Sequence, residues 1–370
     1  MNVEDNRIIW HATVTTAKMD MIGIRKQITA QVGMGLLPLL GAATPADSGT
    51  HPRNEEAYDL YLRSVAVPHD AASNKEAIAV LERAVGMDPN YAPTWEQLGL
   101  RYYYDATYSD GGEKTFQRSN NSYERTLALD PNRLFAAGSL ITNRVERGEL
   151  AKAYEAAAAL VKRRPESAQA HFTLGYVLRY AGMLEESSRE CDTALSLDPG
   201  NYTFRSCAWS FMELGKFDRA MNFVQLDAGS EWFASMMPAL LLREGKVADA
   251  RQAVKHMPAV PYHRDLLVAC LQGPTSELDR MAREAETSQP SDPDPELSYY
   301  QGSIFAFCGK KEAAIHMLKS AVEQNYCAYS NLRSDPLLAK LRGTPEFSQL
   351  LSTAKECQNT VLAERNKSSR

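Results

Sequence analysis

The chain has 370 residues, of which 44% are hydrophobic and 24% charged, and its formal net charge is -5. This length exceeds what one compact core usually fills, so it predicts two domains or an elongated array of repeats. The slight excess of acidic residues and the lack of a Lys/Arg run argue against a broad phosphate-binding surface, and therefore against nucleic acid as a partner. No apolar run is long enough to cross a bilayer, so we expect no insertion into a membrane.

The cysteines and histidines give no sign of a cross-linked or metal-binding chain. None of the six cysteines forms a C-x-x-C pair, and they lie in apolar helical patterns, as around Cys191. This setting favours free buried thiols over a disulfide framework. The seven histidines are scattered, so we expect no metal and no cofactor. We expect a cytoplasmic protein, with the periplasm as the alternative compartment.

The chain begins with a pattern typical of one strand followed by one helix. Residues 7–15 predict the strand, and residues 20–37 predict a helix with one apolar face, formed by Ile24, Ile28, Val32 and Leu36. The apolar stretch over residues 32–43 starts late for a signal peptide, so we interpret it as the helix end followed by a linker. One strand and one helix cannot close a sheet domain. We assign residues 1–41 to this strand–helix segment and residues 42–53 to the linker.

Helix-ending signals recur along the middle of the chain, at Pro89, Pro131, Pro165 and Pro199. The last three are 34 residues apart, and the first step is 42, which is 34 plus an insertion of 8. Because proline lacks a backbone donor and restricts the residue before it, a helix must stop shortly before each one. A stop at a fixed period predicts a repeated helical hairpin.

Glycines mark the expected turn inside each hairpin. Five of them stand five residues before a small residue: Gly148, Gly182, Gly215, Gly245 and Gly309. Glycine permits a tight turn with positive φ, and the small residue lets the two helices approach closely. The step from Gly245 to Gly309 is 64 residues, so we expect an irregular helical pair there, interrupted by several prolines.

The first-helix pattern of Trp95, Leu98, Gly99 and Tyr102 is similar to that of the tetratricopeptide repeat family. The resemblance spans about residues 54–325, and includes small residues such as Ala194 in the second helices. It implies an all-α fold, an α-solenoid of about six or seven hairpins whose first helices line a concave groove. Residues 334–347 resemble the segment that caps such arrays, so we assign residues 326–370 to capping helices and a polar tail.

The first 41 residues resemble the tail of the TolB-like domain that precedes such repeats in multi-domain bacterial signalling proteins. In that domain a strand ending in Trp is followed by a helix, as around Trp10 here. The resemblance implies an alternative function: a regulatory segment of a kinase, a cyclase or a CadC-like transcription regulator whose effector domain is absent from this chain.

The chain carries no motif of a known catalytic centre. No phosphate-binding loop, nucleophile elbow or zinc-protease motif occurs in it. We therefore predict a non-catalytic protein–protein interaction module, a scaffold or sensor that binds a protein or peptide segment. An enzyme with an unrecognised site is a third hypothesis, and the oligomeric state stays open.

The tetratricopeptide register implies which side chains would contact the partner in the groove. Aromatic residues and Arg are favoured at recognition surfaces, and residues four apart share a helix face. Packing between neighbouring hairpins is the alternative role for each of them. The predicted groove set is Tyr103, Phe135, Phe172, Tyr176, Arg179, Tyr180, Thr203 and Ser206.

Overall fold

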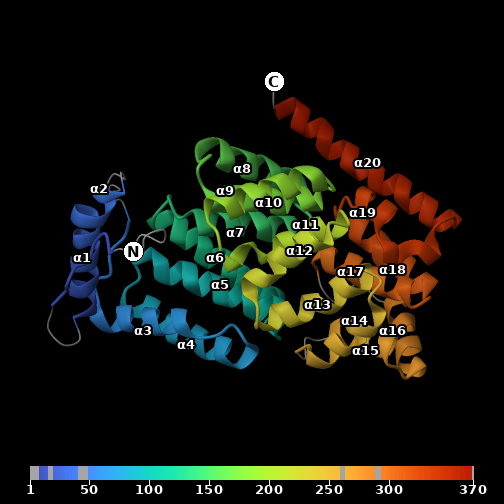
Figure 1. Cartoon of the computed structure of the whole chain (residues 1–370), viewed down its shortest axis with the longest axis horizontal. Coiled ribbons are helices and arrows are strands. Elements are labelled where there is room, and N and C mark those ends of the chain that lie inside the picture. Colours follow the sequence, from blue (N-terminus) through green and yellow to red (C-terminus); the bar gives the residue numbers. More distant parts are fainter. Residues whose placement is uncertain (1–7, 16–19, 41–48, 259–262, 288–292, 369–370) are drawn as a thin grey trace. The chain divides into compact units, whose positions relative to one another are not determined.

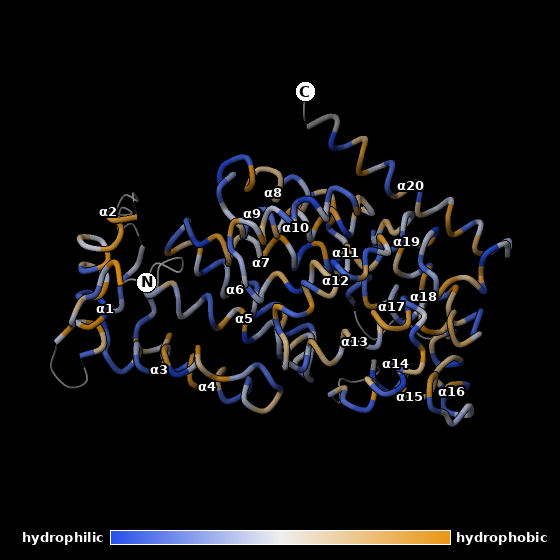
Figure 2. The backbone as a smooth tube through the Cα atoms, viewed as in Figure 1, coloured by the Kyte–Doolittle hydropathy of each residue, from blue (hydrophilic) through white to orange (hydrophobic). Residues whose placement is uncertain are grey.

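The computed structural model describes residues 8–15, 20–40, 49–258, 263–287 and 293–368. The chain divides into two compact units, Met1–Ala137 (unit 1) and Gly138–Arg370 (unit 2). Figure 1 shows that the described secondary structure is helical, as predicted for an all-α fold. Figure 2 shows hydrophobic and hydrophilic residues interspersed along the helices, as in amphipathic helices. Among the described residues, no helix is both long and apolar enough to cross a membrane.

The N-terminal helix is present, but the strand before it is not. Helix α1 (Met21–Gln31) continues through the π-helical turn η1 (Val32–Leu36) into α2 (Leu37–Leu39), which confirms the helix predicted over residues 20–37. Asp20 caps α1 by accepting a hydrogen bond from the Gly23 amide at 2.7 Å. The predicted strand over residues 7–15 is wrong for residues 8–15, which are irregular. An isolated strand would leave its backbone donors and acceptors unpaired.

Unit 1 continues with two helical hairpins and the start of a third. Their helices are α3 (Glu55–Ala66), α4 (Ala71–Met87), α5 (Ala92–Tyr108), α6 (Gly112–Leu129) and α7 (Leu134–Val145), the last of which spans the unit boundary. Helix α1 packs on the first hairpin, where Ile22 joins the buried rings of Tyr58 and Tyr91. The insertion of 8 residues in the 42-residue step is accommodated by the long helices α5 and α6, of 17 and 18 residues.

Unit 2 completes the third hairpin with α8 and adds five more. Their helices are α8 (Leu150–Arg163), α9 (Ala168–Tyr180), α10 (Leu184–Leu197), α11 (Ala208–Glu213) after the 3-10 helix η2 (Tyr202–Cys207), α12 (Phe217–Val224) with η3 (Gln225–Asp227), α13 (Glu231–Arg243), α14 (Val247–Ala253) with η4 (Val254–His256), α15 (His263–Leu271), α16 (Thr275–Thr287), α17 (Pro295–Phe307) and α18 (Lys311–Glu323). The chain ends with α19 (Tyr329–Ser334), η5 (Pro336–Leu341) and α20 (Pro345–Ser368). The described residues thus form eight hairpins rather than six or seven.

The extra hairpin comes from the irregular 64-residue step. It holds α15 and α16, a short pair flanked by the undescribed residues 259–262 and 288–292. The predicted helix ends are confirmed elsewhere: α4, α6, α8 and α10 each end two residues before the predicted proline. The expected irregular pair is therefore one more hairpin of the same kind.

The repeat pattern also fixes a hydrogen bond at the start of two first helices. The indole Nε1 of Trp95 donates to the carbonyl of Pro89 at 2.9 Å. His171, six residues after Pro165, makes the same bond from Nε2 to the Pro165 carbonyl at 2.9 Å. The repeat position held by Trp in α5 is therefore held by a histidine in α9, and each side chain joins its helix to the proline turn before it.

The turn glycines adopt the conformation predicted for them. All five have φ between 69° and 80°. At Gly182 a second constraint applies, because a Cβ built there would lie 2.1 Å from the Cys327 carbonyl oxygen. Only glycine lets the α9–α10 turn approach the segment before α19 so closely.

Enlarging a small residue at a helix crossing is expected to destabilise unit 2. Ala194 in α10 is fully buried. Ala194→Leu adds three carbon atoms to a packed site and is expected to cost about 1–3 kcal/mol, measured as a lower thermal unfolding midpoint. Ala159→Leu, at an exposed position of α8, is the matched control and should leave the midpoint within error. Equal midpoints for both variants would contradict the packing register.

Candidate functional site

The two predicted groove residues of unit 1 lie in partly exposed aromatic surroundings. Tyr103 in α5 is half-buried, and its ring centroid is 6.2 Å from that of Phe116 and 6.5 Å from that of the exposed Tyr108. Phe135 in α7 is also half-buried, with its ring in edge contact with Tyr123 at 6.3 Å. Both rings therefore combine a packing role with accessible surface.

The aromatic surroundings of Tyr103 form a cluster that we call the tyrosine cluster: His69, Tyr103, Tyr104 and Tyr108. The ring centroid of Tyr104 lies 4.5 Å from that of His69 and 5.4 Å from that of Tyr108. Tyr108 is 38% exposed. The cluster lies at the end of α5 and just before the start of α4, and the ion pair of Lys75 and Asp110 joins the same two segments.

Four predicted groove residues of unit 2 have roles within the chain. Phe172 is buried against Phe204, with ring centroids 5.2 Å apart. The half-buried Tyr176 donates its hydroxyl proton to Glu146 at 2.6 Å. Thr203 binds the Asn201 side chain with its amide and hydroxyl, and Ser206 accepts a bond from Arg179 through its carbonyl at 3.0 Å.

Arg179 and Tyr180 do not line an open groove, which corrects that part of the prediction. The Arg179 side chain is 1% exposed and forms a bidentate ion pair with Glu296. Its Nε donates to Oε1 at 2.6 Å and its Nη2 donates to Oε2 at 3.0 Å. The Tyr180 hydroxyl donates to Asp294 at 2.9 Å. Both acids stand at the start of α17, more than 110 residues further along the chain. The charge of Arg179 is thus compensated within the chain itself.

The contact of α9 with α17 belongs to a larger fold-back of the C-terminal elements within unit 2. The Cys327 amide donates to the Tyr180 carbonyl at 2.8 Å, and Gln358 of α20 donates to the Gly182 carbonyl at 2.8 Å. Helix α20 contacts α8, and α19 contacts α11. In a simple solenoid each repeat touches only its neighbours. Unit 2 departs from that pattern, because its last helices pack on its first hairpins.

Glu213 lies in the same buried region, at the end of α11. It is 4% exposed, and its Oε1 accepts a hydrogen bond from the Tyr326 hydroxyl at 2.7 Å. That hydroxyl is also 3.3 Å from Oε1 of Glu296, and it accepts a bond from the Asn331 amide at 3.3 Å. Burial, together with the neighbouring Glu296 carboxylate, raises the pKa of Glu213 to about 8.

A second buried ion pair holds α13 to the turn before η5. Arg243 donates from Nε and Nη2 to Oδ2 of Asp335, at 3.1 Å and 2.8 Å, and both side chains are at most 2% exposed. The Tyr299 hydroxyl of α17 donates to the same oxygen at 3.1 Å. Two separate arginine–carboxylate pairs therefore join the early hairpins of unit 2 to its C-terminal elements.

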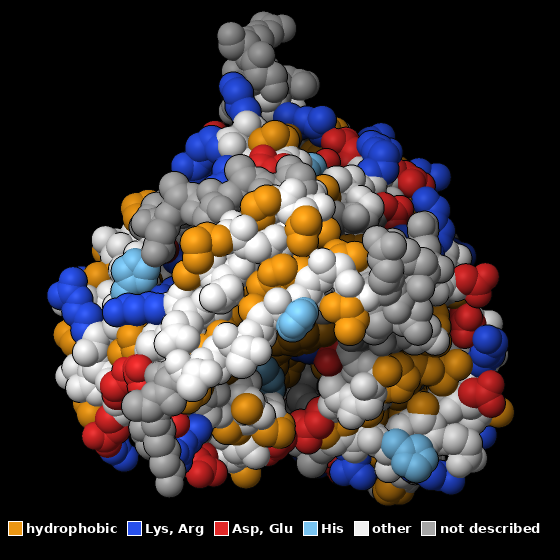
Figure 3. All heavy atoms as spheres, turned by 60° about the vertical axis from the view of Figure 1, so that its left-hand side comes forward, with side chains coloured by type: hydrophobic (Ala, Val, Ile, Leu, Met, Phe, Trp, Pro, Cys, Tyr) orange, Lys and Arg blue, Asp and Glu red, His pale blue; other side chains and the backbone are white. Residues whose placement is uncertain are grey.

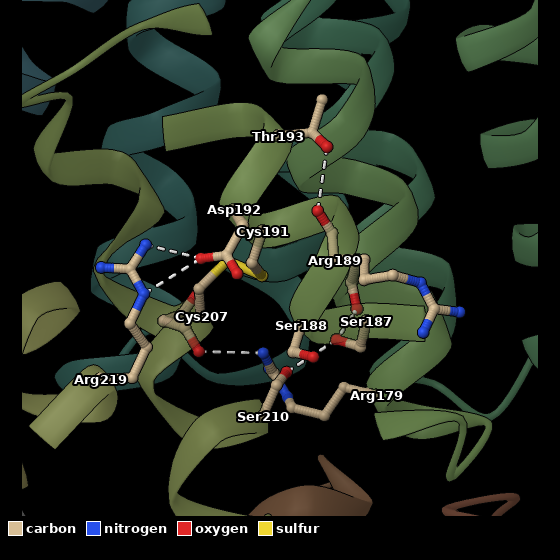
Figure 4. The surroundings of a disulfide bond; sticks show 12 residues. Arg179, Ser187, Ser188, Arg189, Cys191, Asp192, Thr193, Cys207, Ser210 and Arg219 are labelled. Carbon is tan, nitrogen blue, oxygen red and sulfur yellow. Dashed lines mark hydrogen bonds and ion pairs between the residues drawn. A yellow bond between two sulfur atoms is a disulfide. The ribbon is translucent and has the colours of Figure 1, made fainter. Parts of the chain in front are cut away.

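The prediction of free thiols is wrong: all six cysteines form disulfides. Cys191 pairs with Cys207, Cys270 with Cys308 and Cys327 with Cys357, at Cα–Cα distances of 5.9, 5.7 and 5.3 Å. Figure 4 shows the first of them, which joins α10 to η2 and lies beside the Arg219–Asp192 pair. Cys308 directly follows α17, and Cys327 lies between α18 and α19, so two of the bridges tie a helix to a segment outside the helices. An apolar helical setting in the sequence did not distinguish a bridged thiol from a free one.

Hydrophobic side chains gather on the face that carries α1 and α2 (Figure 3). The exposed members are Ile28 at 49%, Met34 at 73%, Leu39 at 61% and Leu40 at 59%. In the described part of the chain, no group of three or more His, Cys, Asp or Glu side chains is arranged to hold a metal ion.

Comparison with known proteins supports the fold and goes no further. No protein-family model matches the chain, and no curated protein matches it. Among solved structures, the chain is similar to the APC/C hetero-tetramer Cut9-Hcn1, at 15% identity and a TM-score of 0.52 over 82% of this chain and 60% of that one. The thermophilic TPR protein TTC0263 of Thermus thermophilus matches at 17% identity and a TM-score of 0.37, over 52% of this chain and 97% of that one. MamA of Desulfovibrio magneticus RS-1 matches at 18% identity and a TM-score of 0.31, over 45% of this chain and 88% of that one.

Proposed function

We propose that this tetratricopeptide-type array is a non-catalytic scaffold that binds a segment of another protein. The observation that carries the proposal is the tyrosine cluster, in which partly exposed rings stand on a first helix of the hairpin array. Tyrosine supplies a large apolar contact area together with a hydroxyl, so it is frequent at the centres of protein interfaces. The predicted groove residue Tyr103 belongs to this cluster, and Phe135, which is also half-buried, is a further candidate contact on α7.

We propose unit 1 for the partner site because two of the predicted groove residues of unit 2 are bonded within the chain. Arg179 and Tyr180 are bonded to α17, and α17 is itself a core helix, in which Ile304 and Phe305 are fully buried. A partner could displace α17 only by unfolding part of unit 2. Tyr176, Thr203 and Ser206 are half-buried and are secondary candidates for contact.

The disulfides favour the periplasm or another oxidising compartment over the cytoplasm. Disulfides persist where thiols are not kept reduced and are rare in cytosolic proteins. Three bridges that use every cysteine of the chain fit an extracytoplasmic scaffold. The alternative, a regulatory segment of a cytoplasmic kinase, cyclase or transcription regulator, rests on the resemblance of the N-terminal segment alone and is the weaker proposal.

Replacing Tyr103 is expected to weaken partner binding by about thirtyfold or more. A central aromatic anchor typically contributes about 2 kcal/mol or more on truncation. The partner is first captured with the intact protein, and Tyr103→Ala is then titrated against it by calorimetry. The control is Tyr154→Ala, which removes another half-buried tyrosine, on the second helix α8, and should change affinity little. Greater loss in the control would contradict the placement of the site, provided circular dichroism shows both variants folded.

A further inference from the structure

The buried charges around Glu213 do not balance. Two arginines, Arg179 and Arg243, are each paired with one carboxylate, Glu296 and Asp335 respectively. Glu213 is not paired with either arginine, and its carboxylate accepts a hydrogen bond from the neutral hydroxyl of Tyr326. An ionised carboxylate in such surroundings is costly unless a cation or several donors compensate it. Asp294, the other buried acid of the cluster without an arginine partner, accepts both the Tyr180 hydroxyl and the Glu296 backbone amide. Glu213, with a single donor, is therefore the least compensated acid of the cluster.

The hydrogen bonds around Tyr326 lead to the same conclusion. The single hydroxyl proton of Tyr326 can serve only one acceptor at a time, and it is shared between Glu213 at 2.7 Å and Glu296 at 3.3 Å. Within the described part of the chain, Oε2 of Glu213 and Oδ1 of Asn331 are buried without a hydrogen-bond partner. When Glu213 is ionised, both of these oxygens can only accept hydrogen bonds. A proton on Glu213 would turn one of its oxygens into a donor and remove the surplus negative charge.

We propose that Glu213 is a proton-binding site of the folded protein, and that the docking of α17 and α19 on α9 and α11 weakens when this proton leaves. The site lies where these four helices meet: Arg179 comes from α9, Glu213 from α11, Glu296 from α17 and Asn331 from α19. A charge that appears on Glu213 faces Glu296 across the shared hydroxyl of Tyr326. The titratable and charged groups that interact with Glu213 are Arg179, Arg243, Glu296, Tyr299 and Tyr326. Tyr180, Asp294 and Asp335 in turn contact these groups.

The direction of the pH effect follows from proton linkage. The pKa of Glu213 is raised from its ordinary value of 4.5 to about 8, so the folded protein holds the proton more tightly than the unfolded chain. The protonated Glu213 therefore contributes its full stabilisation of the folded state below about pH 4.5, the pKa in the unfolded chain. This contribution decreases as the pH rises and is lost once the pH passes about 8, the pKa in the folded protein. Between about pH 6 and pH 8 this single site is expected to lower the folded-to-unfolded ratio by about fiftyfold.

The experiment compares three forms of the intact, disulfide-bonded protein. Urea unfolding is measured from about pH 5.5 to pH 9 for the wild type, Glu213→Gln and Glu312→Gln, the last an exposed glutamate of α18 as control. Relative to Glu213→Gln, the wild type should lose about fiftyfold in its folding constant between pH 6 and pH 8, and the control should follow the wild type. Superimposable pH profiles for the wild type and Glu213→Gln would overturn the proposal.

Two further measurements test the site directly. Infrared difference spectra at about pH 6.5 should contain a carboxylic acid C=O band that Glu213→Gln lacks and Glu312→Gln keeps; absence of that difference overturns the proposal. Tyr326→Phe removes the donor to the ionised form of Glu213, so it should move the pH at which this band disappears upward. A midpoint that is unmoved or moved downward would show that Tyr326 does not stabilise the ionised form, and would overturn the arrangement proposed here.

Discussion

Reduction of the three disulfides is expected to destabilise unit 2 strongly and to leave unit 1 almost unaffected. The bridges join residues 16, 38 and 30 positions apart. Loop closure over these lengths is worth about 3–4 kcal/mol per bridge in the chain-entropy model. All six cysteines lie between residues 191 and 357, and unit 1 contains none. The contribution of each bridge is thus a large fraction of the free energy of unfolding of a typical domain, which is roughly 5–15 kcal/mol.

The measurement is denaturant unfolding with and without reductant, followed segment by segment through amide hydrogen exchange. Exchange in α9–α18 should accelerate after reduction, while α3–α6 keep their protection. The paired variant Cys270→Ala/Cys308→Ala isolates the longest loop and should lower stability by about 4 kcal/mol in the absence of reductant. The matched control is the wild-type protein incubated in the same buffer with the oxidised form of the reductant. Unchanged unfolding in reductant would contradict the expected contribution of the bridges.

The hairpins could be predicted because their signals are local in sequence. Proline ends a helix within two residues of itself, and the glycine turns lie inside a single repeat, so α4–α10 follow from short stretches of residues. The predicted strand failed for the opposite reason. Residues 8–15 have β-branched composition, but a strand is stable only beside another strand, and whether one is available is not a local property.

The fold-back of unit 2 could not be predicted from the repeat pattern. The pattern places Tyr176 and Arg179 on one helix, α9, as candidates for contact with a partner, whereas the structure pairs Arg179 with an acidic group of the chain itself. The sequence cannot say that this group is Glu296, 117 residues further on. The disulfides were missed for a similar reason: free thiols were predicted from the local helical setting of each cysteine, and which cysteines lie close together in the fold is not a local property.

Removing one member of the Arg179–Glu296 pair is expected to destabilise unit 2 by about 3–5 kcal/mol. Arg179→Ala would leave Glu296 and the Ser206 carbonyl without their guanidinium partner, in a site where both charged side chains are at most 7% exposed. Water cannot replace the lost donors without opening the α9–α17 contact. The free energy of unfolding is measured in urea at neutral pH. The control is Lys216→Ala, which breaks the exposed pair with Glu185 and should have little effect because solvent already screens that pair.

The double variant Arg179→Met/Glu296→Leu separates the cost of an unpaired charge from the value of the pair. If most of the loss in Arg179→Ala comes from the stranded Glu296 carboxylate, replacing both groups by apolar side chains of similar volume should recover a large part of it. Each single replacement, Arg179→Met and Glu296→Leu, should then be less stable than the double variant, with a coupling energy well above about 1 kcal/mol. Additive losses would mean that the two side chains act independently. In that case the α9–α17 contact would be held by its apolar neighbours, and a partner protein could compete for Arg179 after all.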